Sequence, residues 1–108
     1  MKHVVEKFIT TTNASDIDGA LSLFAPTAVI DDVSVGDEFV GSDGVRAYLE
    51  QFFVGYKTSS RLLSFENIDD LTAVARIDFT GDFGHEVGTL KMAMNPDGLI
   101  QRIDADLV

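Results

Sequence analysis

The spacing of apolar residues changes near residue 58, and this change constrains the fold more than any other feature of the sequence. Up to that point apolar side chains recur every three or four positions, as over 2–12, which is the spacing of an amphipathic helix. Beyond it, as over 71–80, apolar and polar side chains alternate, which is typical of half-buried strands. Helices followed by antiparallel strands predict an α+β fold, with the helices gathered on one face of a sheet.

Three helices are expected in the first half of the chain. The first covers residues 2–12. The second is expected to begin after Ser15, whose hydroxyl would cap it, and to keep helical spacing to Phe24 before Pro26 ends it. The third is expected to begin after a capping Ser42 and to carry apolar side chains at helical spacing over three turns.

A short hairpin is expected between the second and third helices, and four longer strands after the third. The hairpin consists of TAVIDDV at 27–33 and a return strand at Phe39–Val40. The later strands should form an antiparallel meander, because turn signals separate them at Asp69–Asp70 and at NPDG, residues 95–98. Their expected ranges are 59–68, 71–80, 89–94 and 99–108.

The length of 108 residues is that of one domain, and the sequence has no repeat, linker or low-complexity segment. We therefore expect residues 1–108 to form a single domain with one core. A long, strongly twisted antiparallel sheet curls around the helices that cover it, and the space between the two is a natural pocket.

The composition excludes several classes of partner and site. With 18 acidic and 8 basic residues the formal charge is −10, so the surface repels nucleic acid and anionic membranes. The lack of cysteine excludes disulfides, thiol catalysis, zinc knuckles and iron–sulfur clusters. His3 and His85 are too few and too isolated for a zinc site. We expect no metal, no cofactor, and no nucleic-acid or membrane partner.

The sequence also suggests where the protein resides. No apolar run approaches the ~20 residues that cross a bilayer. The N-terminal segment MKHVVEKFITTTN is charged and amphipathic, and it lacks the continuous apolar stretch and cleavage site of a signal peptide. We therefore expect a cytoplasmic location.

Three segments resemble the nuclear transport factor 2-like superfamily, and within it the SnoaL-like and ketosteroid isomerase-like families. They are NASDIDGALSLFAPTAVIDD at 13–32, FVGSDGVRAYLEQFF at 39–53 and DGLIQRIDADL at 97–107. The resemblance implies a cone-shaped α+β fold, in which three N-terminal helices pack on a curved, mainly antiparallel sheet that encloses a pocket. Because this fold hosts isomerases, cyclases, dehydratases, epoxide hydrolases and non-catalytic binders, it does not fix the chemistry.

The adjacent pair Asp31 and Asp32 carries the chemical part of the resemblance. In ketosteroid isomerases a strand at this point holds an aspartate general base nine residues before the glycine of the third helix, and Asp32 has this spacing to Gly41. Since side chains alternate along a strand, one aspartate should face the pocket and the other solvent. A carboxylate beside apolar walls is a stronger base, because desolvation disfavours its charged form. Asp32 is therefore the candidate catalytic residue, with a solvated strand end as the alternative.

The donors that stabilise an oxyanion in ketosteroid isomerases have no counterpart at the matching positions. The tyrosine of the first helix falls on Phe8, and the protonated aspartic acid of a later strand falls near Leu90. Tyr48 or Tyr56, on the inner face of the third helix, could supply a substitute donor. The alternative is that both are core aromatics with a hydrogen-bonded hydroxyl.

The sequence thus predicts a mostly apolar pocket that binds a small hydrophobic molecule. Asp32 could add proton-transfer chemistry of the isomerase, cyclase or dehydratase class, and the alternative is a non-catalytic module for ligand binding or dimerisation. A homodimer through the outer sheet face is expected from the resemblance. The expected pocket walls are Phe8, Phe24, Phe39, Tyr48, Phe52, Tyr56, Leu90 and Met92.

Limonene epoxide hydrolase-like enzymes offer a second constellation, in which an arginine bridges two aspartates. Arg76 and Asp78 fall on the corresponding strand, and Asp104 or Asp106 could complete the set. Alternation along the strand opposes this arrangement, because Arg76 and Asp78 have the opposite parity to Ile77. If the apolar parity faces the helices, these charges form cross-strand ion pairs on the outer face instead.

Overall fold

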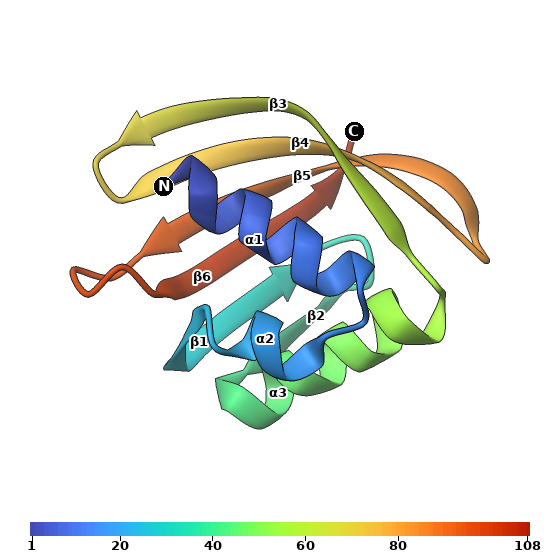
Figure 1. The fold of residues 1–108 in the computed structure, drawn as a ribbon, viewed down its shortest axis with the longest axis horizontal. Coiled ribbons are helices and arrows are strands. Elements are labelled where there is room, and N and C mark those ends of the chain that lie inside the picture. The colour runs from blue at the N-terminus through green and yellow to red at the C-terminus, as the bar shows by residue number, and fades with distance from the viewer.

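The computed structural model describes residues 1–108 as helices that cover one face of a six-stranded sheet (Figure 1), so the α+β class is confirmed. None of the helices is long and apolar enough to cross a membrane. The elements are α1 (Lys2–Asn13), α2 (Ile17–Leu21), β1 (Phe24–Asp32), β2 (Asp37–Val40), α3 (Gly41–Leu49), the π-helical segment η1 (Glu50–Gly55), β3 (Ser59–Asp69), β4 (Thr72–Gly81), β5 (Gly84–Met94) and β6 (Ile100–Leu107).

The strands follow the order β2-β1-β6-β5-β4-β3 across the sheet. Strands β3 to β6 form an antiparallel meander, as the alternating sequence predicts. β1 pairs with β6 in parallel, which is the one parallel contact in the sheet. This pairing joins the two halves of the chain and sets Asp32 beside Ala105.

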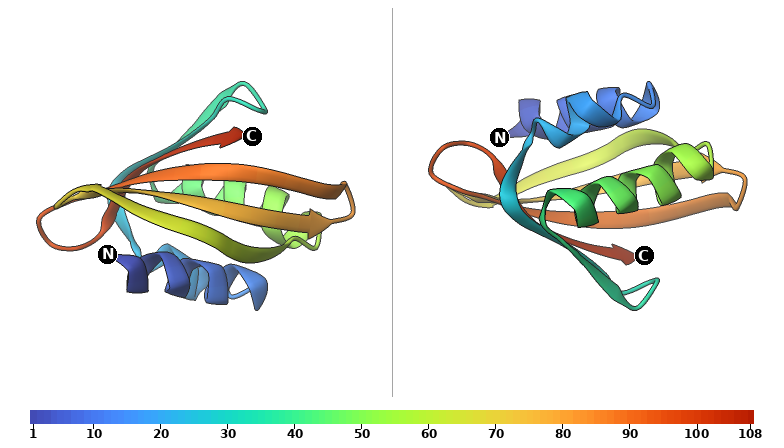
Figure 2. Two further views of the ribbon diagram at one scale, coloured as in Figure 1. Left: turned by 90° about the horizontal axis from the view of Figure 1, so that it is seen from above. Right: turned by 90° about the horizontal axis from the view of Figure 1, so that it is seen from below.

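The sheet curls so that its concave face holds the helices (Figure 2). α1 contacts β3, and α3 contacts β1 and β2. Between them lies a core whose largest fully buried side chains include Phe8, Ile30, Leu49, Ile77 and Met92. These residues come from both the helical and the alternating patterns of the sequence, which therefore bury their apolar sides against each other.

The second helix is shorter than predicted, and its cap is a different residue. Asp16, not Ser15, accepts the hydrogen bond from the Gly19 backbone N–H at 2.9 Å. Ser15 has a left-handed backbone with φ of 57°, so it belongs to the turn before the helix. Phe24 begins β1 and does not extend the helix. Pro26 is tolerated in this strand because the pairing of β1 with β6 is interrupted between Phe24 and Val29.

The start of α3 also differs from the prediction. The helix begins at Gly41, and Ser42 makes no side-chain cap. Gly41 has φ of +74°, a conformation that glycine adopts at little cost, and it allows the chain to turn from β2 directly into the helix. After Leu49 the helix widens into η1.

Two hairpin turns differ from the prediction, one in position and one in length. The β3–β4 turn is Asp70–Leu71, one residue later than expected, because the Asp69 carboxylate accepts a hydrogen bond from the Leu71 N–H at 2.9 Å. The β4–β5 turn contains only Asp82 and Phe83. β5 therefore begins at Gly84, well before the expected residue 89, and residues 84–88 belong to the sheet.

Candidate functional site

A cavity of about 250 Å³ lies between the end of α3, η1 and the strands β4, β5 and β6. Ten of its fifteen lining residues are apolar or aromatic. Its rim includes exposed apolar side chains, so the cavity is accessible from solvent. The lining residues are Asp32, Ser34, Val35, Tyr48, Phe52, Phe53, Tyr56, Thr58, Phe79, Phe83, Glu86, Leu90, Ala105, Asp106 and Leu107.

Asp32, at the end of β1, is the only buried residue with an ionisable carboxyl group, and it is 6% exposed. Its side chain has the same parity as the core residues Ala28 and Ile30, and it therefore points to the concave face. The Tyr48 hydroxyl donates a hydrogen bond of 2.6 Å to Asp32 Oδ2. The sequence predicts that one residue of the pair Asp31 and Asp32 faces the pocket, and in the structure that residue is Asp32.

The second oxygen of Asp32 holds the β1–β2 turn. Asp32 Oδ1 accepts hydrogen bonds from the Ser34 backbone N–H at 3.0 Å and from the Ser34 hydroxyl at 2.6 Å. An aspartate that bonds the backbone two residues ahead is a common turn-forming device. Asp32 therefore has a structural role at Oδ1, while Oδ2 is the oxygen that meets Tyr48.

Tyr48 is fixed by its surroundings as a hydrogen-bond donor. Burial raises the pKa of Tyr48 well above its ordinary value, and the hydrogen bond to Asp32 raises it further. The phenol consequently keeps its proton at all physiological pH values. A neutral phenol beside a carboxylate can hold that carboxylate in place and can donate to other oxygens, but it cannot act as a base.

A row of aromatic rings follows α3 and η1 along the cavity. Tyr48, Phe52 and Tyr56 recur every four residues, and the centroids of successive rings are 4.9 Å and 5.7 Å apart. The ring of Phe53 lies 6.2 Å from that of Phe79, which projects from β4. π-helical turns such as η1 are rare and occur frequently at functional sites, where they place side chains that a regular helix would direct elsewhere.

Five of the nine residues that the sequence selects for a site line the cavity, namely Asp32, Tyr48, Phe52, Tyr56 and Leu90. Phe8, Phe24, Phe39 and Met92 do not. Phe8 and Met92 are fully buried core residues. Phe24 lies at the far end of β1, where it pairs with Ile100. Phe39 packs its ring against Tyr48 at 5.0 Å from the β2 side, so it supports the cavity wall without reaching the cavity.

The residues that sequence reasoning missed lie mainly on the β4–β5 hairpin and at the end of β6. Phe83 and Glu86 contribute to the cavity because β5 begins as early as Gly84, and Phe79 contributes from the apolar parity of β4. One sequence signal was available, since a glycine inside a strand often marks a close approach of other groups. A Cβ at Gly88 would lie 3.0 Å from the Phe79 ring, so this glycine makes room for an aromatic wall.

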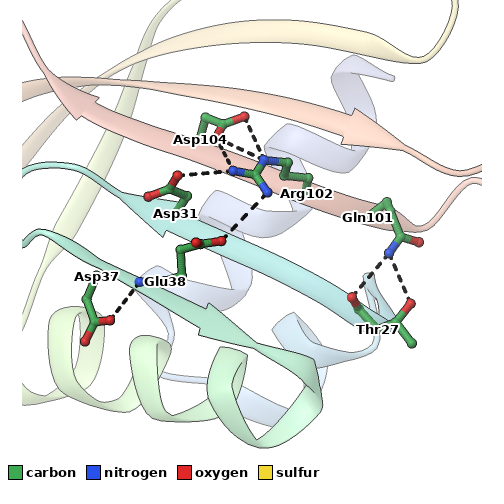
Figure 3. Close-up of polar contacts among 7 residues, drawn as sticks. All are labelled: Thr27, Asp31, Asp37, Glu38, Gln101, Arg102 and Asp104. Atoms are coloured by element: carbon green, nitrogen blue, oxygen red, sulfur yellow. Dashed lines mark hydrogen bonds and ion pairs between the residues drawn. The ribbon is translucent and has the colours of Figure 1, made fainter.

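The outer face of β2, β1 and β6 carries a separate polar network centred on Arg102 (Figure 3). Its guanidinium forms ion pairs with Asp104 at 3.0 Å, with Asp31 at 3.1 Å and with Glu38 at 4.0 Å. Hydrogen bonding to Asp104 raises the pKa of Arg102, and the charges of Asp104, Asp31 and Glu38 add to this effect. In this view the helices lie behind the sheet, so the network is on the face opposite the cavity.

Arg76 and Asp78 do not form an epoxide hydrolase-like constellation. Arg76 is exposed on the outer face of β4. Asp78 has the same parity and contacts Arg61 at 2.9 Å and His85, not Arg76. The hydrogen bond from Arg61 lowers the pKa of Asp78, and His85 contributes to this decrease. Neither residue lines the cavity, because the apolar parity of β4 faces the helices.

No group of three or more histidine, cysteine or acidic side chains is arranged to hold a metal ion. His85 lies beside Asp78 on the outer face, and His3 lies on α1, far from it along the chain.

The sequence model of the SnoaL-like domain matches residues 5–103. A comparison with curated proteins gives no significant sequence match. The fold, in contrast, is shared with many solved structures.

Three solved structures illustrate the similarity. A proposed polyketide cyclase from Sinorhizobium meliloti is 21% identical, with 95% of this chain and 93% of that chain covered and a TM-score of 0.85. A Mycobacterium tuberculosis protein in complex with estradiol-17beta-hemisuccinate is 18% identical, with coverage of 94% and 88% and a TM-score of 0.84. The epoxide hydrolase/cyclase-like enzyme of pyran ring formation in salinomycin is 17% identical, with coverage of 99% and 89% and a TM-score of 0.85. At sequence identities of 17–21%, these similarities establish that the chain shares its fold with the three proteins.

Proposed function

The chain belongs to the SnoaL-like domain family, and on this premise we propose that its cavity binds a small hydrophobic molecule. The observation that carries the proposal is an aromatic cavity of about 250 Å³ with a single buried carboxylate at its inner wall. Small-molecule sites are typically concave and mostly apolar, with a few polar groups that orient the ligand, and span roughly 300–1,000 Å³. The ligand is accordingly small. The steroid bound by the Mycobacterium tuberculosis protein supports the hydrophobic class.

We propose further that Asp32 acts as a general base through Oδ2. Oδ1 is occupied by two hydrogen bonds from Ser34, whereas Oδ2 accepts one hydrogen bond, from Tyr48, and keeps a second lone pair. A proton on the carbon next to a substrate carbonyl would move to this lone pair, the C–H electron pair would form the C=C bond of an enolate, and the π pair of the carbonyl would move to its oxygen. Return of the proton to another carbon of the enolate system gives isomerisation. Attack of the enolate carbon on a second carbonyl of the same molecule, whose oxygen takes the proton, gives cyclisation, and loss of a β-hydroxyl group, which leaves as water with that proton, gives dehydration.

Tyr48 would supply the oxyanion donor in this scheme. Its raised pKa keeps the phenol protonated, so its proton can be shared with a substrate oxygen whenever the hydrogen bond to Asp32 weakens. Once Asp32 has accepted the proton, negative charge resides on the substrate oxygen, and the hydroxyl gains more by donating to that oxygen. Removal of one such donor typically lowers the rate by about 10²–10³-fold.

A non-catalytic binding protein is the second candidate function, and one observation favours it. The buried donors of the cavity are already engaged within the protein: Tyr48 bonds Asp32, and the Thr58 hydroxyl bonds the Phe52 carbonyl oxygen at 2.6 Å. Tyr56, the other candidate donor, lies at the exposed rim. No buried donor is therefore free to meet an oxyanion before a ligand enters. In this case the same cavity would bind its ligand without changing it.

Hydrogen–deuterium exchange at carbon separates the two functions. Small apolar ketones and lactones with exchangeable α-protons are incubated with the protein in D₂O, and deuterium incorporation is followed by NMR. A general base predicts exchange above background that Asp32→Asn lowers by about 10²-fold or more, while Asp31→Asn, the matched change on the outer face, leaves it unchanged. Equal exchange in the wild type and in Asp32→Asn contradicts a catalytic Asp32.

We also propose that two copies associate through the outer sheet face. This face presents the Arg102 network and the exposed Val40 rather than a helix-covered surface. Sedimentation at about twice the chain mass of 11.7 kDa supports the dimer, and sedimentation as a single chain contradicts it. A cytoplasmic location is likewise proposed, and cell fractionation tests it.

A further inference from the structure

We infer that the cavity selects amphiphilic organic cations, in which an ammonium group is attached to an apolar body. The inference rests on the proposed function, because it names the ligand class of the same cavity. It depends on three features: the charge of the cavity walls, the lack of a counter-ion for Asp32, and the chemistry of the mouth.

The cavity walls carry negative charge and no positive charge. Among the fifteen lining residues are the carboxylates of Asp32, Glu86 and Asp106, and none is lysine, arginine or histidine. Asp106 belongs to the outward parity of β6, opposite Thr89, so its side chain is directed away from the concave face. Asp32 and Glu86 are therefore the two carboxylates that a bound ligand meets.

Asp32 has hydrogen-bond donors but no cationic partner. Its three donors are the Tyr48 hydroxyl and the hydroxyl and backbone N–H of Ser34, all neutral, and it forms no ion pair within 4.0 Å. The arginines that do form ion pairs, Arg46, Arg61 and Arg102, pair with other carboxylates. A buried carboxylate without a counter-ion produces a negative potential that water screens poorly. This potential extends through the poorly solvated cavity to its mouth, where it favours a cationic head group and disfavours an anionic one.

The mouth of the cavity offers a second interaction that suits a cation. Tyr56 and Phe83 lie at the rim with 41% and 38% exposure, and their ring centroids are 6.0 Å apart. Glu86 pairs with Phe79 across β4 and β5, so its side chain lies on the concave side of the same rim. It forms no ion pair with any residue of the chain. Aromatic faces attract ammonium groups through cation–π interactions, and a neighbouring carboxylate adds Coulomb attraction.

These features orient the ligand. The ammonium group lies at the mouth, between Tyr56, Phe83 and Glu86, and the apolar body extends inward along Phe52 and Leu90. The inner end of the body then reaches Asp32, which stays available for proton transfer. A carboxylate or phosphate head group is repelled in either orientation of the ligand, by Glu86 at the mouth or by Asp32 at the inner end of the cavity. The formal charge of −10 repels such a ligand before it makes contact.

The test compares three probes that share one phenylalkyl body and differ in head-group charge: phenylbutylamine, phenylbutanol and phenylpentanoate. Their dissociation constants are measured at neutral pH by NMR titration or calorimetry, at low salt and again at about 0.5 M salt. We expect the amine to bind about tenfold more tightly than the alcohol, and the carboxylate to bind most weakly. The preference for the amine should decrease at high salt, where exposed charges are screened.

Two variants locate the ammonium group, and one serves as a matched control. Glu86→Gln should lower the amine-to-alcohol affinity ratio about threefold, and Phe83→Leu should lower it similarly while keeping an apolar rim. Asp82→Asn removes a charge from the same hairpin at a residue that does not line the cavity, so it should leave the ratio nearly unchanged.

The outcomes separate this inference from the proposed function. An alcohol that binds as tightly as the amine overturns the inference and leaves the hydrophobic cavity as a binding site. Failure of all three probes to bind contradicts both. A ratio that survives Glu86→Gln and Phe83→Leu contradicts the position of the ammonium group at the mouth.

Discussion

Asp31 and Asp32 are neighbours in the sequence, but β1 places them in two different electrostatic environments. Asp32 faces inward, is 6% exposed and is held by neutral donors from Tyr48 and Ser34. The Asp31 side chain faces outward, is 30% exposed and pairs with the charged guanidinium of Arg102 at 3.1 Å. One strand therefore carries a carboxylate compensated by dipoles on one side and a carboxylate compensated by charge and water on the other.

The comparison teaches that the number of contacts is a poor guide to their importance. Arg102 reaches three carboxylates, but each pair is partly exposed, and exposed ion pairs contribute about 0–1 kcal/mol because water and salt compete. Tyr48 makes one hydrogen bond, but it satisfies a buried carboxylate, and a buried group that loses its partner costs about 1–3 kcal/mol. The inner aspartate should therefore be much more sensitive to mutation than the outer one.

The largest effect is expected for Tyr48→Phe. This change keeps the ring and its packing but removes the hydroxyl, so Asp32 Oδ2 loses its only donor from the protein. We expect the free energy of unfolding to fall by about 2 kcal/mol, measured by urea denaturation at pH 7. Phe52→Leu, in the same wall, is a control for altered packing. A loss below about 0.5 kcal/mol in Tyr48→Phe would show that solvent replaces the hydroxyl.

The second effect is a loss of stability at alkaline pH. Because burial and the bond to Asp32 raise the pKa of Tyr48, the folded protein keeps a proton that the unfolded chain releases above about pH 10. The stabilisation is fully present below pH 10 and is lost as pH rises above it, with a slope of at most about 1.4 kcal/mol per pH unit. Denaturation midpoints between pH 9 and pH 11.5 should show this decrease in the wild type and a smaller one in Tyr48→Phe. Parallel pH profiles for the two proteins contradict a buried, proton-retaining Tyr48.

The smallest effect is expected for Arg102→Gln on the outer face. Although the change removes every ion pair drawn around the guanidinium in Figure 3, the unfolding free energy should fall by less than about 1 kcal/mol, because the groups are partly exposed. The difference from the wild type should shrink further in about 0.5 M salt. A loss as large as that of Tyr48→Phe would mean that the outer network is not accessible to solvent in solution, as in a tightly associated dimer.

Much of the fold could be predicted from the sequence, because it depends on the period of the apolar residues. The change from helical spacing to alternation places the helices before the meander, and both patterns bury the side that the sequence marks as apolar. The ends of elements were harder to predict. Asp16 and Ser15 are both good capping residues, and only the left-handed backbone of Ser15 decides between them.

The candidate site was less accessible to prediction, because it depends on which aromatic rings meet in space. Phe39 and Phe52 are both half-buried aromatics, but only Phe52 lines the cavity, since Phe39 approaches Tyr48 from the opposite side. Phe83 and Glu86 fall between the expected strands 71–80 and 89–94, and the observed two-residue turn brings both to the rim. The direction of Asp32 followed from strand alternation once its register with Ala105 was known.

The central claim is that the concave cavity, and not the outer face, is the ligand site. The most direct measurement is an NMR titration with phenylbutanol, with chemical-shift changes mapped onto both faces of the sheet. We predict that the changes concentrate on cavity residues such as Phe52, Leu90 and Ala105, while Ala93 and Arg102 on the outer face remain unchanged. Changes centred on the Arg102 network, or none at saturating probe, would contradict the claim.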